Sequence, residues 1–313
     1  MTNAFTFPGQ GSQAVGMGKA LADAYTEARA VFAEVDAALG QRLSALMWNG
    51  PAEELTLTEN AQPALMAVSL AAMRVLEARG VSVAKHAAFV AGHSLGEYSA
   101  LAAAGSLTIS DAARLLRIRG RAMQAAVPVG VGAMAALLGL DYAAAEEVAA
   151  EAAAGDVCQA ANDNADGQVV VSGSVAAVER AVIIAKARGA KRAMLLNVSA
   201  PFHSALMQPA AVVMAAALAE VTIKPPVVPV VVNVLAGPLN DPDLIRTSLV
   251  DQVTGTVRWR ESVKWMAGAG VTRLVEIGSG KVLTGLVKRI VDGVEAVAVN
   301  GPEDVDKLVA SLA

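Results

Sequence analysis

The stretch from Ala87 to Gly105 constrains the fold of this chain more than any other. A short apolar run, 87–91, leads into Gly92-His-Ser-Leu-Gly96, and an alanine-rich segment follows and ends at Gly105. The apolar run bounded by glycine predicts a buried strand, and the alanine-rich segment predicts a helix that glycine terminates. A strand, a sharp turn with serine at its apex and a helix together make a nucleophile elbow. We therefore expect an α/β protein with this turn at the end of a strand.

Ser94 stands at the apex of the turn, so we interpret it as a nucleophile. The amides at the N-terminus of the following helix, beginning with Leu95, would point toward an oxyanion formed there. A plain strand–helix turn without chemistry remains the alternative interpretation. The five letters alone are a weak motif, so a partner base must be found elsewhere in the chain.

A serine hydroxyl needs an adjacent base, usually histidine, and the chain has only three histidines. His93 neighbours Ser94 on the turn, so its side chain should point away from the serine. His86 precedes the strand and should lie at the opposite end of the sheet. His203 remains, at the start of a predicted helix whose N-terminus would help to keep the imidazole neutral. The alternative is a loop histidine bonded only to backbone groups.

No third catalytic residue can be chosen from the residues alone. Asp241, Asp243 and Asp251 are candidates for orienting the histidine, but none lies in a motif, and a backbone carbonyl would serve as well. A predicted helix over 111–126, capped by Ser110, carries four arginines. By default each of them, Arg119 included, is a solvated side chain.

Strands and helices alternate along the rest of the chain, which indicates a mostly parallel sheet covered on both faces. Residues 128–196 differ, because their order of strand, helix, strand, strand, helix, strand is that of a ferredoxin-like unit. Within this unit the polar run 162–167 predicts a turn. We expect an inserted small domain over 128–196 and a discontinuous large domain over 1–127 and 197–313. The other predicted helices are 20–39, 62–79, 204–220, 244–253, 259–269 and 281–291, and the later strands are 227–234, 273–277 and 296–299.

Composition narrows the partners and the compartment. Hydrophobic residues make up 55% of the chain and charged residues 17%, which excludes disorder. The net charge of −4 and the lack of a basic run with interleaved aromatics argue against nucleic acid. The apolar stretches 122–140 and 197–219 contain prolines, so neither is expected to span a membrane. The single cysteine, Cys158, permits no internal disulfide, and the first residues do not look like a signal peptide, so we expect a cytoplasmic protein.

Five motifs occur in a fixed order along the chain. They are Phe7-Pro-Gly-Gln-Gly-Ser-Gln13, Gly92-His-Ser-Leu-Gly-Glu97, Arg119-Gly120, Gln168-Val-Val-Val-Ser-Gly173 and Pro201-Phe-His-Ser204. As a set they resemble the malonyl-CoA:acyl carrier protein transacylases of fatty-acid synthesis, from the first strand to about residue 300.

This resemblance implies a fold and an activity. The fold is an α/β-hydrolase-like large domain with a ferredoxin-like small domain. The activity is transfer of a malonyl group from malonyl-CoA to the phosphopantetheine thiol of acyl carrier protein, by a ping-pong Ser/His mechanism with a malonyl-serine intermediate. It also implies that malonyl-CoA and acyl carrier protein are the partners, with no cofactor, no metal, no nucleic acid and no membrane, and that the enzyme is a monomer.

The resemblance also assigns roles to residues. Ser94 corresponds to the malonylated nucleophile and His203 to its base, while the amides of Gln10 and Leu95 correspond to the oxyanion hole. Arg119 corresponds to the arginine that grips the malonyl carboxylate. The remaining matches are Asn162 as a small-domain site residue and Gln252, whose main-chain carbonyl would orient the histidine. Phe202 departs from the serine that many members have there, and in related domains phenylalanine accompanies malonyl rather than branched acyl units.

Three other functions remain open at this stage. A thioester hydrolase would use the same Ser94 and His203, but a buried Arg119 would suit a carboxylate better than a neutral acyl group. A malonyl loader for a polyketide pathway would have the same site. A non-enzymatic module that binds carrier protein would not need the intact Ser/His pair.

Overall fold

A six-stranded sheet forms the centre of the fold. The computed structural model describes residues 1–312 and orders the strands β10-β9-β1-β2-β7-β8. Their bounds are β1 (Asn3–Phe7), β2 (Phe89–Gly92), β7 (Val230–Val232), β8 (Gly237–Leu239), β9 (Arg273–Ile277) and β10 (Glu295–Val299). All pairs are parallel except β7 with β8. The central strands β1 and β9 are buried along their whole length, as strands covered on both faces should be. The predicted α/β class with a mostly parallel sheet is confirmed.

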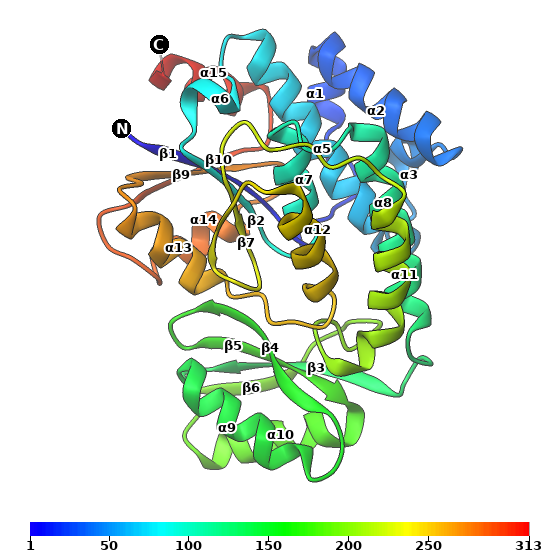
Figure 1. Cartoon of the computed structure of the whole chain (residues 1–313), viewed down its shortest axis with the longest axis vertical. Helices are drawn as coiled ribbons and strands as arrows, with labels where there is room; N and C mark the ends of the chain where they lie inside the picture. The colour runs from blue at the N-terminus through cyan, green and yellow to red at the C-terminus, as the bar shows by residue number, and fades with distance from the viewer. Residues whose placement is uncertain (313) are drawn as a thin grey trace.

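Helices cover both faces of this sheet (Figure 1). They are α1 (Lys19–Ala24), α2 (Thr26–Leu39), α3 (Leu43–Asn49), α4 (Ala52–Thr56), α5 (Thr58–Ala78), α6 (Val83–His86), α7 (Gly96–Ala103), α8 (Ile109–Ala125), α11 (Gln208–Ala219), α12 (Pro242–Asp251), α13 (Trp259–Gly268), α14 (Val282–Val287) and α15 (Pro302–Leu312). Apolar residues surround α5 on nearly every side, and it packs against α2, α7 and α8 in the larger core. A smaller core under α13 and α14 covers the other face.

A second, antiparallel sheet lies at one end of the molecule (Figure 1). Its strand order is β4-β5-β3-β6, with β3 (Gly132–Leu138), β4 (Cys158–Ala165), β5 (Gln168–Ser174) and β6 (Arg192–Leu195). The two helices α9 (Tyr142–Ala153) and α10 (Val175–Ala187) pack against this sheet around a separate hydrophobic core. Along the chain these elements follow one another as strand, helix, strand, strand, helix, strand.

The second sheet binds the loop before α13 through β4. The Asp163 amide donates to the Val257 carbonyl over 2.9 Å, and the Val257 amide donates to the Ala161 carbonyl over 2.9 Å. The buried Asp163 carboxylate also accepts two hydrogen bonds from Arg260, at 2.9 and 3.0 Å. The predicted turn over 162–167 was therefore wrong. These polar residues continue β4 because its second half binds the loop before α13, and the turn is only Asp166–Gly167.

Several helix bounds also differ from the predictions, and α5, predicted over 62–79, already begins at Thr58. The segment 20–39 forms two helices, because Tyr25 adopts an extended conformation between them. Thr108, not Ser110, caps α8, and its hydroxyl accepts from the Asp111 amide at 3.0 Å. The segment 204–220 begins with a short 3-10 turn, and α11 starts only at Gln208, next to Pro209. The short helices α3 and α4 and the terminal helix α15 were not predicted at all.

Candidate active site

The elbow has the predicted strand–turn–helix form. β2 ends at Gly92, α7 begins at Gly96, and Ser94 between them has φ 51°. A Cβ on Gly92 would collide with the backbone of Gly96, and a Cβ on Gly96 would collide with the Phe7 carbonyl oxygen. The tight turn against β1 is therefore possible only with glycine at both positions. The sequence G-x-S-x-G follows from this geometry.

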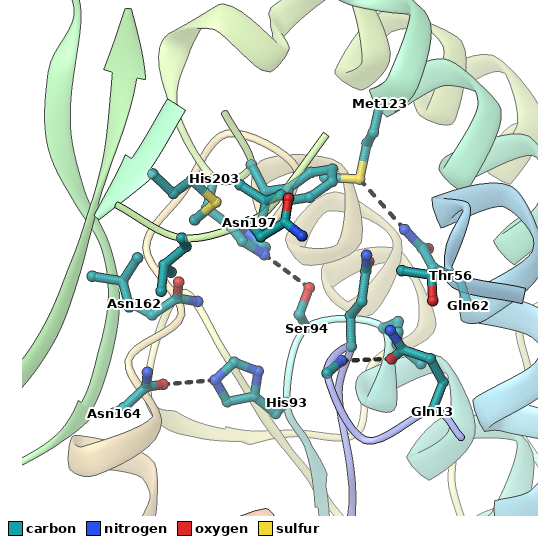
Figure 2. A pocket seen from close by; sticks show the side chains of 18 of the residues that line it. Gln13, Thr56, Gln62, His93, Ser94, Met123, Asn162, Asn164, Asn197 and His203 are labelled. Carbon is teal, nitrogen blue, oxygen red and sulfur yellow. Dashed lines mark hydrogen bonds between the residues drawn. The ribbon is translucent and has the colours of Figure 1, made fainter. Parts of the chain in front are cut away.

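Ser94 and His203 meet although they lie far apart in the sequence. The serine Oγ is 2.8 Å from His203 Nε2, and Figure 2 shows the two side chains pointing at one another. On the other side of the ring, Nδ1 lies 2.9 Å from the Gln252 carbonyl oxygen and 3.2 Å from that of Gly255. Carbonyls only accept, so Nδ1 carries the hydrogen and Nε2 presents its lone pair to the serine.

Backbone carbonyls, and not the carboxylates of Asp241, Asp243 or Asp251, contact His203 Nδ1. Asp241 instead caps α12, where its side chain accepts from the amides of Asp243 and Leu244. This local role explains why Asp241 precedes a helix in the sequence.

His203 is held in its neutral form. Only 3% of the residue is exposed, and burial lowers the pKa of His203 to about 3, with the charge of Arg119 adding to the effect. From the sequence we expected the N-terminus of the following helix to keep the imidazole neutral. However, α11 begins only at Gln208, and burial is the largest cause. A neutral imidazole is the form that can take a proton from serine.

Arg119 lies next to the Ser94 hydroxyl. It is 1% exposed, and its Nη2 donates to Ser94 Oγ at 3.1 Å and to Gln252 Oε1 at 2.8 Å. Its Nη1 donates to Gln62 Oε1 at 2.9 Å, while Nε has no hydrogen-bond partner among residues 1–312. The guanidinium thus has only neutral acceptors, and within the described chain it forms no salt bridge. A buried cation with this environment can bind an additional anion.

The other three arginines of α8 have different surroundings. Arg114 and Arg121 are exposed and pair with Asp111 and Glu59 at the surface. Arg117 is largely buried, and its Nη1 donates to Asn60. Only Arg119 reaches Ser94, so the default of a solvated arginine is wrong for this residue.

A cavity of about 360 Å³ opens in front of Ser94, between the two sheets. The loop after β1, the elbow, α8, the facing strands of the second sheet and the segment 196–203 line it. Every predicted site residue except Gln252 lines this cavity. These residues are Gln10, Ser94, Leu95, Arg119, Asn162, Phe202 and His203. Gln252 lies behind His203, which its carbonyl contacts.

Two backbone amides beside the cavity are free to bind an anion. Neither the Gln10 amide nor the Leu95 amide donates to a protein acceptor within residues 1–312. The loop that carries Gln10 packs directly on the elbow, since a Cβ on Gly9 would come within 2.8 Å of the His93 carbonyl oxygen. Unpaired amides next to a nucleophile can stabilise an oxyanion.

His93 turns away from the serine, as its position on the turn predicted. Its Nε2 lies 2.8 Å from Asn164 Oδ1 on β4, and Figure 2 shows this contact below Ser94, apart from the contact between Ser94 and His203. The histidine therefore ties the elbow to the second sheet.

Residues 4–306 match the acyl transferase domain family. The chain belongs to this family. It is 52% identical over 299 residues to the malonyl CoA-acyl carrier protein transacylase of Escherichia coli K12, with 96% of each chain covered. It is also 46% identical over 310 residues to the transacylase of the same name from Bacillus subtilis. This alignment covers 99% of this chain and 96% of the relative.

Solved acyltransferase structures are similar along the whole chain. An acyl-carrier-protein-S-malonyltransferase from Bartonella henselae superimposes with a TM-score of 0.98 at 57% identity, covering 100% of this chain and 99% of that one. A malonyl-transacylase solved in complex with its type II PKS acyl-carrier protein gives a TM-score of 0.96 at 45% identity, covering 99% and 100%. This protein is thus an acyltransferase.

Two groups of the candidate site could not be found from the sequence. Gln62, whose side-chain oxygen accepts from Arg119, lies in the interior of α5, and Asn233, whose side-chain oxygen accepts from the Ser94 amide, directly follows β7. No motif marks Gln62 or Asn233, because their roles depend on which strands and helices become neighbours. Within residues 1–312 no cluster of His, Cys, Asp or Glu could hold a metal ion. None of the helices described there has the length and apolarity needed to cross a membrane.

Proposed function

We propose that this acyltransferase transfers the malonyl group of malonyl-CoA to the phosphopantetheine thiol of acyl carrier protein, and so supplies malonyl carrier protein for fatty-acid synthesis. One observation carries the choice of substrate. The buried Arg119 guanidinium lies 3.1 Å from Ser94 Oγ and has only neutral partners, so an acyl group with a free carboxylate would complete its environment. The relatives from Escherichia coli and Bacillus subtilis, which are malonyl CoA-acyl carrier protein transacylases, agree with this substrate.

The geometry supports a two-step mechanism. His203 Nε2 takes the proton of Ser94 Oγ as the oxygen attacks the thioester carbonyl, and the amides of Gln10 and Leu95 stabilise the oxyanion. The tetrahedral intermediate collapses, the C–S bond breaks, and His203 returns the proton to the CoA sulfur. The result is a malonyl ester on Ser94 and free CoA.

The second step reverses these roles. The carrier thiol gives its proton to His203 and attacks the ester carbonyl, and the serine oxygen leaves with the proton from His203. The carbonyls of Gln252 and Gly255 hold the Nδ1–H in both steps and stabilise the imidazolium that forms in between. All of these steps proceed without a metal or a cofactor.

The guanidinium of Arg119 lies at one side of the substrate pocket and the phenyl ring of Phe202 at another. We place the malonyl carboxylate against Arg119, where Nη2 gives up its bond to Ser94 Oγ and, together with the Nε–H that is unpaired in the described chain, forms two parallel hydrogen bonds that fix the orientation of the carboxylate. Phe202 lines the cavity beside His203 and fills the space that an α-branch would need, while Asn162 approaches from β4.

The division into domains supports this function. We infer a large domain of residues 1–127 and 197–313, similar to α/β hydrolases, and an inserted ferredoxin-like domain of residues 128–196. The strand order β4-β5-β3-β6 with two helices on the sheet supports the second assignment. Because the cavity between the domains is formed by one chain, we infer that a monomer is active. Cys158 is free and buried, as expected of a protein in the reducing cytoplasm.

The mass of the intact protein after brief exposure to malonyl-CoA tests the proposal. We expect a malonyl adduct on the wild type, transferable to carrier protein, and no adduct on Ser94→Ala. With His203→Ala the adduct should form at least about 1,000-fold more slowly, because serine and base act as one unit. Adduct on Ser94→Ala, or rapid release of free malonate in place of a stable adduct, would reject the transferase mechanism in favour of another nucleophile or a hydrolase.

A polyketide carrier protein is a second candidate acceptor. The similarity to a malonyl-transacylase bound to a type II PKS acyl-carrier protein favours it. Transfer rates to a fatty-acid carrier protein and to a polyketide carrier protein, measured side by side, distinguish the two. A higher kcat/KM with the fatty-acid carrier protein is the expected result.

A further inference from the structure

The backbone of Ser94 needs support that the glycines of the elbow do not supply. With φ at 51° the serine occupies the left-handed region, which a residue with a Cβ adopts only when its surroundings hold it there. The glycines remove clashes, but they form no hydrogen bond to the serine. Other residues must therefore fix the orientation of its Cα–Cβ bond, and thereby the position of Oγ.

Asn233 binds both sides of the turn. Its Oδ1 accepts from the Ser94 amide at 2.7 Å, and its Nδ2 donates to the Gly92 carbonyl oxygen at 2.7 Å. Asn233 directly follows β7, the parallel neighbour of β2, so the end of one strand secures the turn that follows the next. A single amide thus bridges the residues before and at the apex.

Glu97 gathers the remaining contacts. It lies in the first turn of α7 and is 0% exposed. Its Oε2 accepts from the backbone amide of Asn233 at 2.8 Å and from the side-chain Nε2 of Gln252 at 3.0 Å. The same Gln252 Nε2 also donates to the Ser94 carbonyl oxygen at 3.0 Å. Both backbone polar groups of Ser94 therefore connect, each through one residue, to a single carboxylate oxygen.

We propose that Asn233 and Glu97 are positioning residues, which hold the left-handed Ser94 backbone so that Oγ meets His203 Nε2. In the described chain neither residue lines the cavity, so both act through the serine and not on the substrate. The inference rests on the proposed role of Ser94 as nucleophile. It is independent of the identity of the acyl group.

The hydrogen bonds, and not the charge, are expected to carry the role of Glu97. Its other oxygen, Oε1, has no hydrogen-bond partner within residues 1–312. In Glu97→Gln the amide oxygen can take the place of Oε2, with the NH2 group at the position of Oε1. This variant should therefore keep the turn, whereas Glu97→Ala should release it.

The experiment measures the reactivity of Ser94 in two ways. One is the rate of malonyl-enzyme formation from malonyl-CoA. The other is the rate at which phenylmethylsulfonyl fluoride modifies Ser94, which requires an aligned serine but no recognition of malonyl. If wild-type Ser94 reacts with the fluoride and not with malonyl-CoA, the proposed function fails while the positioning test remains valid.

We expect Glu97→Ala and Asn233→Ala to slow both rates by about 10- to 100-fold, since a displaced nucleophile loses its attack geometry. Glu97→Gln should stay within about threefold of the wild type. Glu276→Ala is the matched control, because Glu276 is an equally buried carboxylate that accepts the amides of Leu283 and Thr284 away from the elbow. It should lose thermal stability and keep the rate.

The isosteric Asn233→Asp covers the case in which the alanine variants do not fold. It keeps the acceptor for the Ser94 amide but sets an oxygen against the Gly92 carbonyl, so both rates should fall about tenfold. Rates in Asn233→Asp and the alanine variants equal to that of Glu276→Ala would overturn the proposal. A Glu97→Gln rate as low as that of Glu97→Ala would overturn it as well, by showing that the charge matters.

Discussion

The two halves of the Ser94–His203 pair are built in different ways. The serine side is local, because Gly92 to Gly96 complete the turn within five residues and the clashes at the two glycines dictate its form. The histidine side is assembled from a loop that ends at His203, the carbonyls of Gln252 and Gly255, and a strand of the second sheet. A short motif can therefore encode the shape of the elbow, to which Asn233 adds hydrogen bonds from the end of β7, whereas the position of His203 depends on the complete fold.

Ser94 and His203 nevertheless both adopt a left-handed backbone conformation that costs free energy. Ser94 has φ 51° and His203 has φ 57°, and each such conformation costs about 1–3 kcal/mol. At the elbow, hydrogen bonds from the neighbouring strand offset this cost. At His203, the loop that carries Gly255 contacts the ring and is itself fixed to β4 by the Val257–Ala161 and Val257–Asp163 backbone bonds. The second sheet thus contributes to the orientation of the His203 ring.

Adding one methyl group to the elbow should have the largest effect. In Gly96→Ala the new Cβ would collide with the Phe7 carbonyl on β1, and backbone cannot move aside cheaply. We expect a loss of at least about 3 kcal/mol of unfolding free energy, measured by urea denaturation, together with loss of transfer activity. Gly268→Ala is the control, because that helical position has open space around it and should change stability by about 1 kcal/mol at most. Equal stability of the two variants would contradict the steric account of the motif.

The contrast between local and assembled halves explains which features the sequence could predict. The elbow, the parallel sheet and the pairing of Ser94 with His203 followed from periodicity, turn chemistry and elimination among three histidines. The extension of β4 through residues 162–165 did not, because these polar residues are strand residues only where another sheet binds them. Likewise, the carbonyl partners of His203 have no side-chain signature, since any residue supplies a carbonyl. The roles of Arg119, Gln252, Gln10 and Asn162 came only from the family resemblance.

Arg119 connects the two halves, and its removal should change selectivity. The structure gives this arginine three neutral acceptors even without substrate, so the cost of leaving it without a carboxylate lies near the lower end of about 2–5 kcal/mol. We expect Arg119→Ala to lose about 30-fold or more of the malonyl-over-acetyl ratio of kcat/KM. Arg119→Lys should recover little, because an ammonium cannot form two parallel bonds. Arg114→Ala, at the exposed face of the same helix, is the control. An unchanged ratio in Arg119→Ala would mean that another residue reads the carboxylate.

The smallest expected effect is that of pH, and it distinguishes a buried base from an exposed one. An imidazole with an ordinary pKa of 6.5 would be about 90% protonated at pH 5.5 and would lose about tenfold in rate. Burial lowers the pKa of His203 to about 3, and the titratable or charged groups that contribute are Arg119 and His93, whose own pKa is also lowered by burial. His203 therefore stays neutral from pH 7.5 down to 5.5, and the rate of malonyl-enzyme formation should change less than threefold.

The low pKa of His203 instead lowers the stability of the folded chain at acidic pH. The unfolded chain binds a proton below pH 6.5 that the folded chain refuses, so the unfolding free energy should fall from pH 6.5 toward 3, and less steeply in His203→Gln. A tenfold drop in rate with a midpoint near 6.5, traced to His203, would show that the ring is not held as the carbonyls of Gln252 and Gly255 indicate.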